Sequence, residues 1–293
     1  MTQPQRIGFI GLGMMGTPMT ACLAKAGFQL FLADADAGRL RDVQATLNAT
    51  ALTPENAKSL DILITMLPNS TIVENVLLGE GGWAASLAPQ AVVIDMSSSE
   101  PARSRDLGQT LKTHNLQYLD APVSGGVKRA VDGSLAILVG GDAEVMQQCR
   151  PVLDAMGKNI LHIGDAGSGH AAKALNNFVS AAGLMATVEA LHVAKRFGID
   201  PGVMVDVLNA SSGGSNTSLN KAKQFMLSGT FGSGFSMQLM NKDLKIAKGL
   251  SDALEYPMIF GQSAIKVWND VAQDATPTTD HTEMYRMLAK EGE

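Results

Sequence analysis

Short apolar runs and helical segments alternate along the first half of the chain. Five runs of mostly apolar residues predict buried strands at residues 7–10, 29–33, 62–66, 92–95 and 117–120. Because these runs are almost continuously apolar, they are typical of a parallel sheet that helices cover on both faces. A further run at residues 135–139, between Gly133 and Gly140, predicts one more strand. We therefore expect an α/β domain with a doubly wound, mostly parallel sheet.

The pattern changes after a glycine-rich segment at residues 164–169. Residues 171–196 form a long apolar stretch with neither proline nor strand alternation, which predicts one long, mostly buried helix. Gly198, Asp200 and Pro201 follow, and they are typical of a helix end, a helix cap and a first helical turn. Helical patterns continue to the end, with breaks at residues 211–216 and 229–234. The predicted domains are thus a sheet domain over residues 1–165 and an all-helical domain over residues 166–293.

Composition and charge narrow the classes of function. The chain has 293 residues, of which 45% are hydrophobic, and this is enough for one large domain or two smaller ones. The net charge is −5 and no run of Lys or Arg forms a patch, which disfavours nucleic acid and anionic membrane as partners. No apolar stretch reaches the ~18 residues of a membrane-spanning helix, and the start of the chain lacks an apolar signal core. We expect a cytoplasmic protein.

Cysteine and histidine give no sign of a metal site. Cys22 and Cys149 both fall in predicted helices, and neither has a partner at metal-ligand spacing. Both are expected to be reduced thiols in the core. The five histidines form no H-x-x-H or H-E-x-x-H array. No metal is predicted.

The first predicted strand leads into a glycine motif. The motif consists of Gly11, Leu12, Gly13, Met14, Met15 and Gly16, in G-x-G-x-x-G spacing, and a predicted helix follows at residues 17–25. Gly11 permits a tight turn, Gly13 lets the backbone approach a pyrophosphate, and Gly16 lets the helix pack close to the strand. The helix N-terminus presents N–H groups and a positive dipole end to the phosphates. This order of elements predicts a dinucleotide site.

Asp34 ends the next predicted strand, 18 residues after Gly16. A carboxylate at this place can accept hydrogen bonds from both ribose hydroxyls of the adenosine half, and it would repel a 2′-phosphate. Ala35 follows, where an NADP enzyme would favour a basic residue, so NAD is favoured over NADP. Asp36 is a rival for the same role, and a solvated turn acid is the alternative.

Two further strand ends supply candidate walls for the cofactor, because ligands of a doubly wound sheet bind beyond the carboxyl ends of its strands. Met66, Leu67 and Pro68 end the third predicted strand and would contact the adenosine side. Ser97 and Ser98 follow the fourth, and one or the other would donate a hydrogen bond toward the ribose and nicotinamide. Spacing alone does not separate these segments from ordinary turns.

Ser124, Gly125 and Gly126 follow the fifth predicted strand. A serine and two glycines expose consecutive N–H groups, and such a backbone can hold a small carboxylate. An ordinary serine–glycine turn is equally consistent with these residues.

Lys173 and Asn177 lie four residues apart near the start of the long predicted helix, so they share one face. That face is otherwise mostly alanine and leucine, and partial burial favours the neutral amine that a base requires. Lys173 would then act as acid/base, and Asn177 would orient the substrate hydroxyl and the ammonium group. A lysine that extends to water is the alternative. His170, one turn earlier, is a rival base.

Together these segments resemble the β-hydroxyacid dehydrogenase family over nearly the whole chain. Four blocks match in order, at residues 11–19, 120–126, 167–177 and 242–244. The resemblance implies an N-terminal Rossmann domain and an all-α C-terminal domain, joined by the long helix. It implies that Lys173 is the catalytic acid/base supported by Asn177, and that residues 124–126 hold the substrate carboxylate. It also implies that Lys242 reaches the nicotinamide end of the cofactor.

The same resemblance implies an NAD-dependent oxidoreductase that oxidises a small 3-hydroxy carboxylate, such as 3-hydroxyisobutyrate or the sugar acid threonate. One alternative is an NADPH-dependent reductase of an aldehyde acid, such as glyoxylate, succinic semialdehyde or tartronate semialdehyde. Another is a non-catalytic NAD-binding scaffold, although such relatives lose the lysine that this chain keeps. Family members commonly form dimers or tetramers through the helical domain, so we expect a homodimer or homotetramer. The substrate, and the roles of Lys128, Arg129 and Asp243, stay open.

Overall fold

The computed structural model describes residues 5–289. Contacts between residues divide the chain into two compact units, Met1–Lys173 and Ala174–Glu293. Residues 1–4 and 290–293, the outer ends of the two predicted domains, lie outside the described residues. Each unit has its own hydrophobic core, so each is described by itself.

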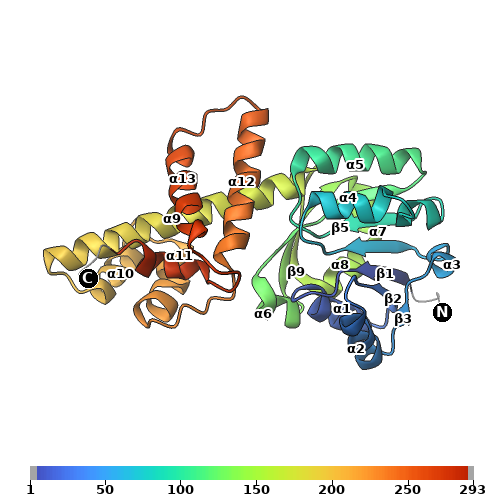
Figure 1. Cartoon of the computed structure of the whole chain (residues 1–293), viewed down its shortest axis with the longest axis horizontal. Helices are drawn as coiled ribbons and strands as arrows, with labels where there is room; N and C mark the ends of the chain where they lie inside the picture. The colour runs from blue at the N-terminus through green and yellow to red at the C-terminus, as the bar shows by residue number, and fades with distance from the viewer. Residues whose placement is uncertain (1–4, 290–293) are drawn as a thin grey trace. The chain divides into compact units, whose positions relative to one another are not determined.

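Within the described residues, the first unit contains a nine-stranded sheet (Figure 1). The strands run in the order β3-β2-β1-β4-β5-β6-β8-β7, and β9 pairs with β8. All pairs from β3 to β6 are parallel, whereas β8 is antiparallel to both β6 and β7. The predicted doubly wound, mostly parallel sheet is therefore confirmed. The strands are β1 (Arg6–Ile10), β2 (Gln29–Ala33), β3 (Thr50–Ala51), β4 (Ile62–Thr65), β5 (Val92–Asp95), β6 (Gln117–Asp120), β7 (Val123–Ser124), β8 (Leu135–Gly141) and β9 (Gly157–Gly164).

Helices cover both faces of this sheet (Figure 1). Along β4, Ile62 and Ile64 pack into the core on one face, while Leu63 packs into the core on the other. Both faces are buried, which explains why the strands are almost continuously apolar. The first face carries α1 (Gly16–Lys25), α2 (Ala37–Leu47), α7 (Ala143–Gln148) and α8 (Arg150–Met156), and the second carries α3 (Pro54–Ala57), α4 (Ser70–Leu78), the short helix η1 (Trp83–Ser86) and α5 (Pro101–Thr113).

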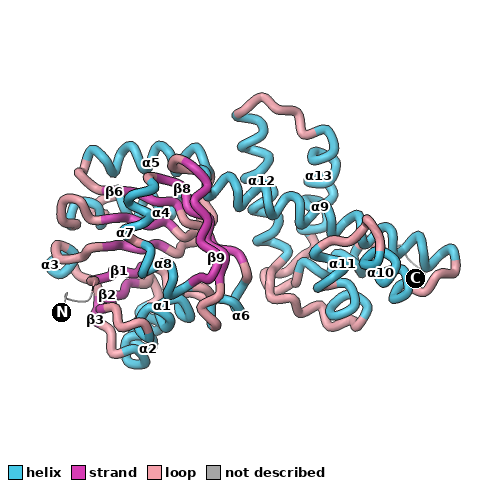
Figure 2. The backbone as a smooth tube through the Cα atoms, turned by 180° about the vertical axis from the view of Figure 1, so that it is seen from behind, coloured by secondary structure: helices cyan, strands magenta, loops and turns pink. Residues whose placement is uncertain are grey.

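Three strands escape prediction from the sequence. The strands predicted at residues 29–33, 92–95 and 117–120 are confirmed at both ends, and the other three differ by one or two residues at one end. The strands β3 and β7 have only two residues each, too few to form a pattern. Figure 2 shows β9 beside β8, on the side of the sheet away from β3. Most residues of β9 are exposed, so it lacks the apolar run of a buried strand.

The long predicted helix is α9 (Ser168–Phe197), an unbroken helix of 30 residues. It begins in the first unit and continues into the second. Gly198 follows with a φ of +99°, and the Asp200 carboxylate caps α10 by accepting a hydrogen bond from Val203 N–H at 3.0 Å. The predicted end of α9 and start of α10 are thus confirmed.

The second unit is built from helices around one core, as predicted. Trp268 is fully buried there, among Leu184 and Val188 from α9 and Met240 and Leu244 from α12. The elements after α9 are α10 (Pro201–Ala210), α11 (Asn216–Asn220), the π-helical turn η2 (Ala222–Leu227), α12 (Met237–Ala253), α13 (Ile259–Gln273), the 3₁₀ turn η3 (His281–Glu283) and α14 (Met284–Met287).

One helix among the described residues, α9, is long and apolar enough to cross a membrane by length and composition. This corrects the expectation that no segment meets that test. The buried side chains of α9 include Ala181, Leu184, Val188 and Leu191, and they pack into the core of the second unit. This packing accounts for the apolar composition of the helix.

The two cysteines are free thiols. Cys22 lies in α1 and is half-buried, whereas Cys149 is buried at the junction of α7 and α8 rather than inside a helix as predicted. Burial raises the pKa of the Cys149 thiol to about 12, so it stays protonated at neutral pH. Among residues 5–289, no three His, Cys, Asp or Glu side chains form a group that could hold a metal ion.

Candidate active site

The glycine loop joins the carboxyl end of β1 to α1. Gly11 has a φ of +100°, and a Cβ at this residue would overlap the carbonyl oxygen of Met66. A Cβ on Gly16 would overlap the carbonyl oxygen of Gly11, so α1 begins in close contact with the turn. The Cβ position of Gly13, in contrast, has nothing within 4 Å. The loop therefore combines a tight turn, close packing and one open side, as a pyrophosphate site requires.

The surroundings of this loop also fit a dinucleotide. A hollow of about 630 Å³ lies beside it, lined by Leu12, Gly13 and Met14 of the loop, Arg39 of α2 and Val127 of α6 (Gly126–Val131). No side chain caps the N-terminus of α1, so its N–H groups are not used by a capping residue. The hollow is open to solvent, and α1, α2 and α6 form the rest of its lining.

The Asp34 carboxylate lies against the glycine loop. One of its oxygens accepts a hydrogen bond from Leu12 N–H at 2.6 Å, and the other accepts one from Asp36 N–H at 2.8 Å. The Arg39 guanidinium lies 3.5 Å from the same carboxylate. Asp36 caps α2, and the N–H groups of Arg39 and Gly38 lower the pKa of its carboxyl group. Of the two candidate acids, Asp34 is the one that touches the loop.

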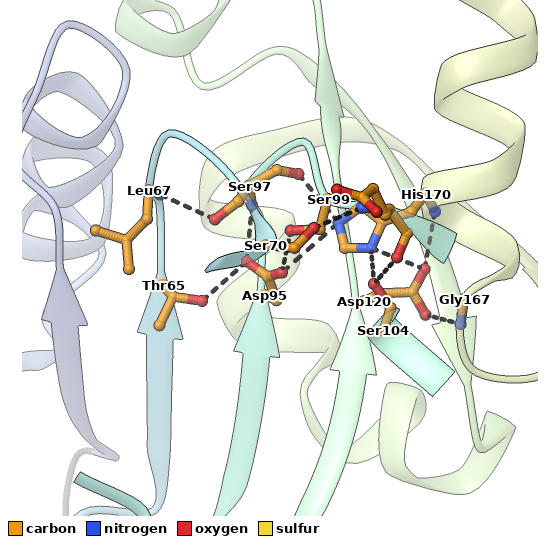
Figure 3. A network of polar contacts seen from close by, with 11 residues as sticks. Thr65, Leu67, Ser70, Asp95, Ser97, Ser99, Ser104, Asp120, Gly167 and His170 are labelled. Carbon is orange, nitrogen blue, oxygen red and sulfur yellow. Dashed lines mark hydrogen bonds and ion pairs between the residues drawn. The ribbon is translucent and has the colours of Figure 1, made fainter. Parts of the chain in front are cut away.

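Ser97 connects two of the predicted cofactor-wall segments. Its hydroxyl accepts a hydrogen bond from Leu67 N–H at 2.9 Å, and its side chain is buried (Figure 3). Ser97 therefore holds the loop after β4 against the loop after β5. Met66, Leu67 and Ser98 are half-buried, and Pro68 is exposed. That these residues contact a cofactor stays a prediction.

Two buried carboxylates lie beneath these loops (Figure 3). Asp95, at the end of β5, accepts hydrogen bonds from the Thr65 hydroxyl at 2.9 Å and the Ser99 hydroxyl at 2.8 Å. Asp120, at the end of β6, accepts hydrogen bonds from Gly167 N–H at 2.6 Å and His170 N–H at 2.8 Å. Asp120 thus caps the start of α9, a role that the sequence analysis did not assign to it.

The His170 ring lies between these two carboxylates. Nδ1 is 2.7 Å from Ser104 Oγ and 3.6 Å from Asp120, while Nε2 is 3.1 Å from the Ser97 carbonyl oxygen and 3.8 Å from Asp95. The ring has no exposed surface. Both nitrogens have partners inside the protein, so the alternative of His170 as the base that meets a substrate does not fit the geometry.

Lys173 lies one turn after His170 on α9 and is buried. Asn177, one further turn along, belongs to the second unit, and its amide nitrogen donates a hydrogen bond to Asp243 Oδ2 at 2.5 Å. Asp243 is buried on α12, and the Lys242 ammonium group lies 3.9 Å from its carboxylate. Asp243 therefore orients the Asn177 side chain, which gives a structural answer to a role that the sequence left open. The proposed roles of Lys173, Asn177 and Lys242 stay predictions.

The serine–glycine segment runs from the last residue of β7, Ser124, to the first residue of α6, Gly126. Gly125 and Gly126 have φ values of +133° and +67°, conformations that favour glycine, and Ser124 is half-buried. The aliphatic part of the Arg129 side chain lies against Gly125, because a Cβ on Gly125 would collide with it. Both Lys128 and Arg129 are exposed. The segment thus lies next to a guanidinium-bearing side chain.

Two family models together match most of the chain. Residues 6–164 match the NAD binding domain of 6-phosphogluconate dehydrogenase. Residues 167–288 match the model described as NAD-binding of NADP-dependent 3-hydroxyisobutyrate dehydrogenase. The two matches meet at the glycine-rich segment before α9.

Similarity to known proteins extends over nearly the full length. The chain is 38% identical to 2-(hydroxymethyl)glutarate dehydrogenase of Eubacterium barkeri over 243 residues, which are 83% of this chain and 81% of the relative. It is 35% identical to 2-hydroxy-3-oxopropionate reductase of Escherichia coli K12, with 97% of each chain covered. Among solved structures, 3-hydroxyisobutyrate dehydrogenase of Mycobacterium tuberculosis with L-serine has a TM-score of 0.91 at 31% identity, covering 98% of this chain and 100% of that one. Matches of this extent show that the chain belongs to the β-hydroxyacid dehydrogenase family of NAD(P)-binding oxidoreductases.

Proposed function

We propose that this protein is an NAD-dependent dehydrogenase that oxidises a small 3-hydroxy carboxylate to the corresponding semialdehyde or keto acid. The observation that carries the proposal is the place of Lys173, a buried lysine in the second turn of α9. The start of α9 is hydrogen-bonded to Asp120, at the carboxyl end of β6. Ligands of doubly wound sheets bind beyond these strand ends, so the lysine belongs to the side on which the cofactor is expected.

The chain's own residues supply binding and proton transfer. The glycine loop and Asp34 would hold the cofactor, and the bound nicotinamide would accept a hydride from the carbon that bears the hydroxyl group. Lys173 takes the hydroxyl proton during oxidation and returns it during reduction. Asn177, fixed by Asp243, lies one turn from Lys173 on the same helix and orients the reacting groups.

Asp34 supports the choice of NAD. A 2′-phosphate on the adenosine ribose would bring negative charge next to this carboxylate. The Arg39 guanidinium, 3.5 Å away, offsets part of that repulsion. We therefore expect a preference for NAD over NADP that depends on the negative charge of Asp34 rather than on steric exclusion of the 2′-phosphate.

The substrate carboxylate is proposed to bind at residues 124–126. Anchoring the carboxylate fixes its distance from the reacting carbon, which is how a small site selects 3-hydroxy over 2-hydroxy acids. L-serine, named with the solved relative of Mycobacterium tuberculosis, has a 3-hydroxyl group and a carboxylate in this relation.

A second carboxylate on the substrate would be complementary to the positive charge of Arg129, next to residues 124–126. Arg129 lies against Gly125, and its guanidinium is only two bonds beyond the carbon that contacts this glycine. The relative of Eubacterium barkeri is named for 2-(hydroxymethyl)glutarate, a 3-hydroxy acid with two carboxylates. We therefore propose a dicarboxylic 3-hydroxy acid as the preferred substrate.

The exposed apolar side chains bear on the oligomeric state of the protein, and the free cysteines bear on its location in the cell. Large apolar side chains of the second unit are exposed, such as Val193 at 67% and Phe197 at 83% on α9, and Ile259 and Phe260 on α13. Exposed apolar groups at this density are typical of a subunit interface, so we propose a homodimer or homotetramer. Two free cysteines suit the reducing cytoplasm.

Replacing Lys173 by Ala removes the proposed acid/base. We expect the turnover number for 3-hydroxy acid oxidation to fall by about 10²–10⁴-fold, the usual contribution of a positioned proton-transfer group. NADH affinity should stay within about threefold, because the glycine loop and Asp34 are untouched. NADH absorbance measures turnover and NADH fluorescence measures binding. Lys195→Ala, an exposed lysine on the same helix, is the control. Normal turnover in Lys173→Ala would refute the assignment.

Cofactor preference tests Asp34. We expect the wild type to bind NADH at least about tenfold more tightly than NADPH, and Asp34→Asn to reduce this ratio, because the amide keeps an acceptor for Leu12 N–H but loses the charge. Fluorescence titration with each nucleotide gives both dissociation constants. Asp42→Asn removes an exposed charge from α2 and should leave the ratio unchanged. A wild type that prefers NADPH would overturn the NAD assignment.

Arg129→Gln tests the second carboxylate. We expect KM for 2-(hydroxymethyl)glutarate to rise about 10–100-fold, as for the loss of one hydrogen bond to a charged group. KM for the monocarboxylate 3-hydroxyisobutyrate should change less than about threefold, because it has no second anion. Lys112→Gln, an exposed lysine at the end of α5, controls for net charge. Equal changes for the two substrates, or no change for either, would contradict the proposal.

The assembly is tested by light scattering after size-exclusion chromatography. We expect a mass of two or four times the 30.8 kDa of one chain. Phe197→Asp places a charge in the proposed interface and should shift the mass toward the monomer. Leu254→Asp is the matched control, because Leu254 is also an exposed apolar residue, at the C-terminal end of α12. A wild-type monomer would show that the exposed apolar face serves another purpose.

A further inference from the structure

Three charged side chains meet where β2 leads into α2 (Figure 1). They are Asp34, Asp36 and Arg39, and the Arg39 guanidinium bridges the two carboxylates. Its Nη1 lies 3.5 Å from Asp34 Oδ1, and its Nη2 lies 3.5 Å from Asp36 Oδ2. The proposed function gives Arg39 only a charge that opposes Asp34, whereas these contacts define a more specific role.

Asp36 holds both the backbone and the side chain of Arg39. One oxygen of Asp36 accepts hydrogen bonds from Gly38 N–H at 2.9 Å and Arg39 N–H at 3.1 Å, and this caps α2. The other oxygen faces the Arg39 guanidinium. The two N–H groups, followed by the charges of Arg39 and Arg41, lower the pKa of the Asp36 carboxyl group, so it is ionised at neutral pH.

The guanidinium lies beside the proposed ribose-binding carboxylate. Leu12 N–H donates a hydrogen bond to Asp34 at 2.6 Å, and Leu12, Gly13 and Arg39 line the same hollow. Asp34 is proposed to bind the ribose hydroxyls of the adenosine half. A 2′-phosphate is attached to one of these hydroxyl oxygens, so it would approach both Asp34 and Arg39.

The Arg39 guanidinium keeps hydrogen-bonding capacity for such a phosphate. Both of its ion-pair distances exceed the usual length of an N–H···O hydrogen bond, and a guanidinium carries several N–H donors in a planar fork. The Arg39 side chain is 46% exposed, and ion pairs at this exposure stabilise a protein little. A phosphate accepts two parallel N–H bonds from arginine, so it can compete with Asp36 for the guanidinium.

The local charge still disfavours a phosphate overall. Two carboxylates face one guanidinium at this end of β2, which leaves an excess of negative charge. Arg41 and Asp42, both exposed on α2, add one charge of each sign and leave this excess unchanged. NAD therefore remains the favoured cofactor, and Arg39 determines how strongly NADP is rejected.

We propose that Arg39 is a specificity-determining residue that lets the cofactor site bind nucleotides with a 2′-phosphate as weaker, second ligands, and that Asp36 limits this binding by holding the guanidinium. The proposal rests on the proposed cofactor site at the glycine loop and Asp34. Cofactor choice then depends on the balance between Asp34, which repels the phosphate, and Arg39, which binds it.

The experiment measures nucleotide binding without turnover. Fluorescence titration gives the dissociation constants of NADH and NADPH, and calorimetry gives those of ADP and 2′,5′-ADP, which lack the nicotinamide. The variants are Arg39→Gln, Asp36→Asn and the double variant, and asparagine keeps the cap of α2. Arg41→Gln removes the same charge from an exposed residue of the same helix and is the matched control.

We expect Arg39→Gln to raise the NADPH dissociation constant about tenfold and to change that of NADH less than about threefold, as for the loss of a hydrogen bond to a charged group. Asp36→Asn should lower the NADPH dissociation constant about three- to tenfold, because the guanidinium is released. In the Arg39→Gln background the same change should have an effect of less than about twofold. ADP and 2′,5′-ADP should follow NADH and NADPH, and Arg41→Gln should alter no value more than about twofold.

Each of four outcomes would overturn the proposal. The wild type could fail to bind 2′,5′-ADP. Arg39→Gln could weaken NADH and NADPH equally, which would place Arg39 on the shared adenosine, or it could weaken neither. Arg41→Gln could reproduce its effect, which would show a general effect of net charge. The gain in Asp36→Asn could persist in the double variant, which would show that Asp36 acts through its own charge.

Failure of the proposed function is distinguishable from these outcomes. A wild type that prefers NADPH, or that oxidises no 3-hydroxy acid, would defeat the proposed NAD-dependent dehydrogenase. The change in the ratio of the NADPH and NADH dissociation constants on Arg39→Gln would still decide the role of Arg39.

Discussion

The hydrogen bonds from the Asp120 carboxylate to the start of α9 are the constraint on which the candidate site depends. They join β6, the last strand of the parallel run that begins at β3, to the helix that carries Lys173. A hydrogen bond to a charged carboxylate is stronger than one to a neutral acceptor, and burial in a low-dielectric interior strengthens it further. The glycine loop and Asp34 lie at the same edge of the sheet, the carboxyl ends of its parallel strands. The strand ends therefore position both the glycine loop and the helix that carries Lys173.

Much of the fold follows from local patterns. Strands such as β4 are apolar throughout, because Ile62 and Leu63 pack into different cores. The helix α9 is predicted because a long apolar stretch without proline admits few alternatives. The strand β9 is missed because its side chains are mostly exposed, and its pairing with β8 is a contact that no local pattern contains.

The candidate site also contains some residues that local sequence predicts and others whose contacts only the fold shows. The roles of the three motif glycines are predictable, because each follows locally from the lack of a side chain. Gly11 permits the tight turn, Gly13 permits close approach of a ligand, and Gly16 permits close packing of the helix. The partners of His170 are not predictable, since Ser104 and Ser97 lie 66 and 73 residues away in the chain. Asn177 and Asp243 are likewise 66 residues apart. A sequence shows that such residues are polar, but only the fold shows which of them meet.

Three parallel strands of this sheet end at or just before an aspartate, and burial separates their uses. Asp95 and Asp120 have no exposed surface to speak of, and hydrogen bonds inside the protein occupy both oxygens of each. The Asp34 carboxylate accepts hydrogen bonds from two backbone N–H groups and keeps 8% of its side chain exposed. Asp120 likewise accepts two N–H hydrogen bonds, one at each oxygen, so partial exposure rather than the number of bonds distinguishes Asp34 from it. The same residue type at the same kind of position thus holds backbone and side-chain groups of the protein where it is fully buried, whereas the partly exposed Asp34 is the one proposed to bind the ribose.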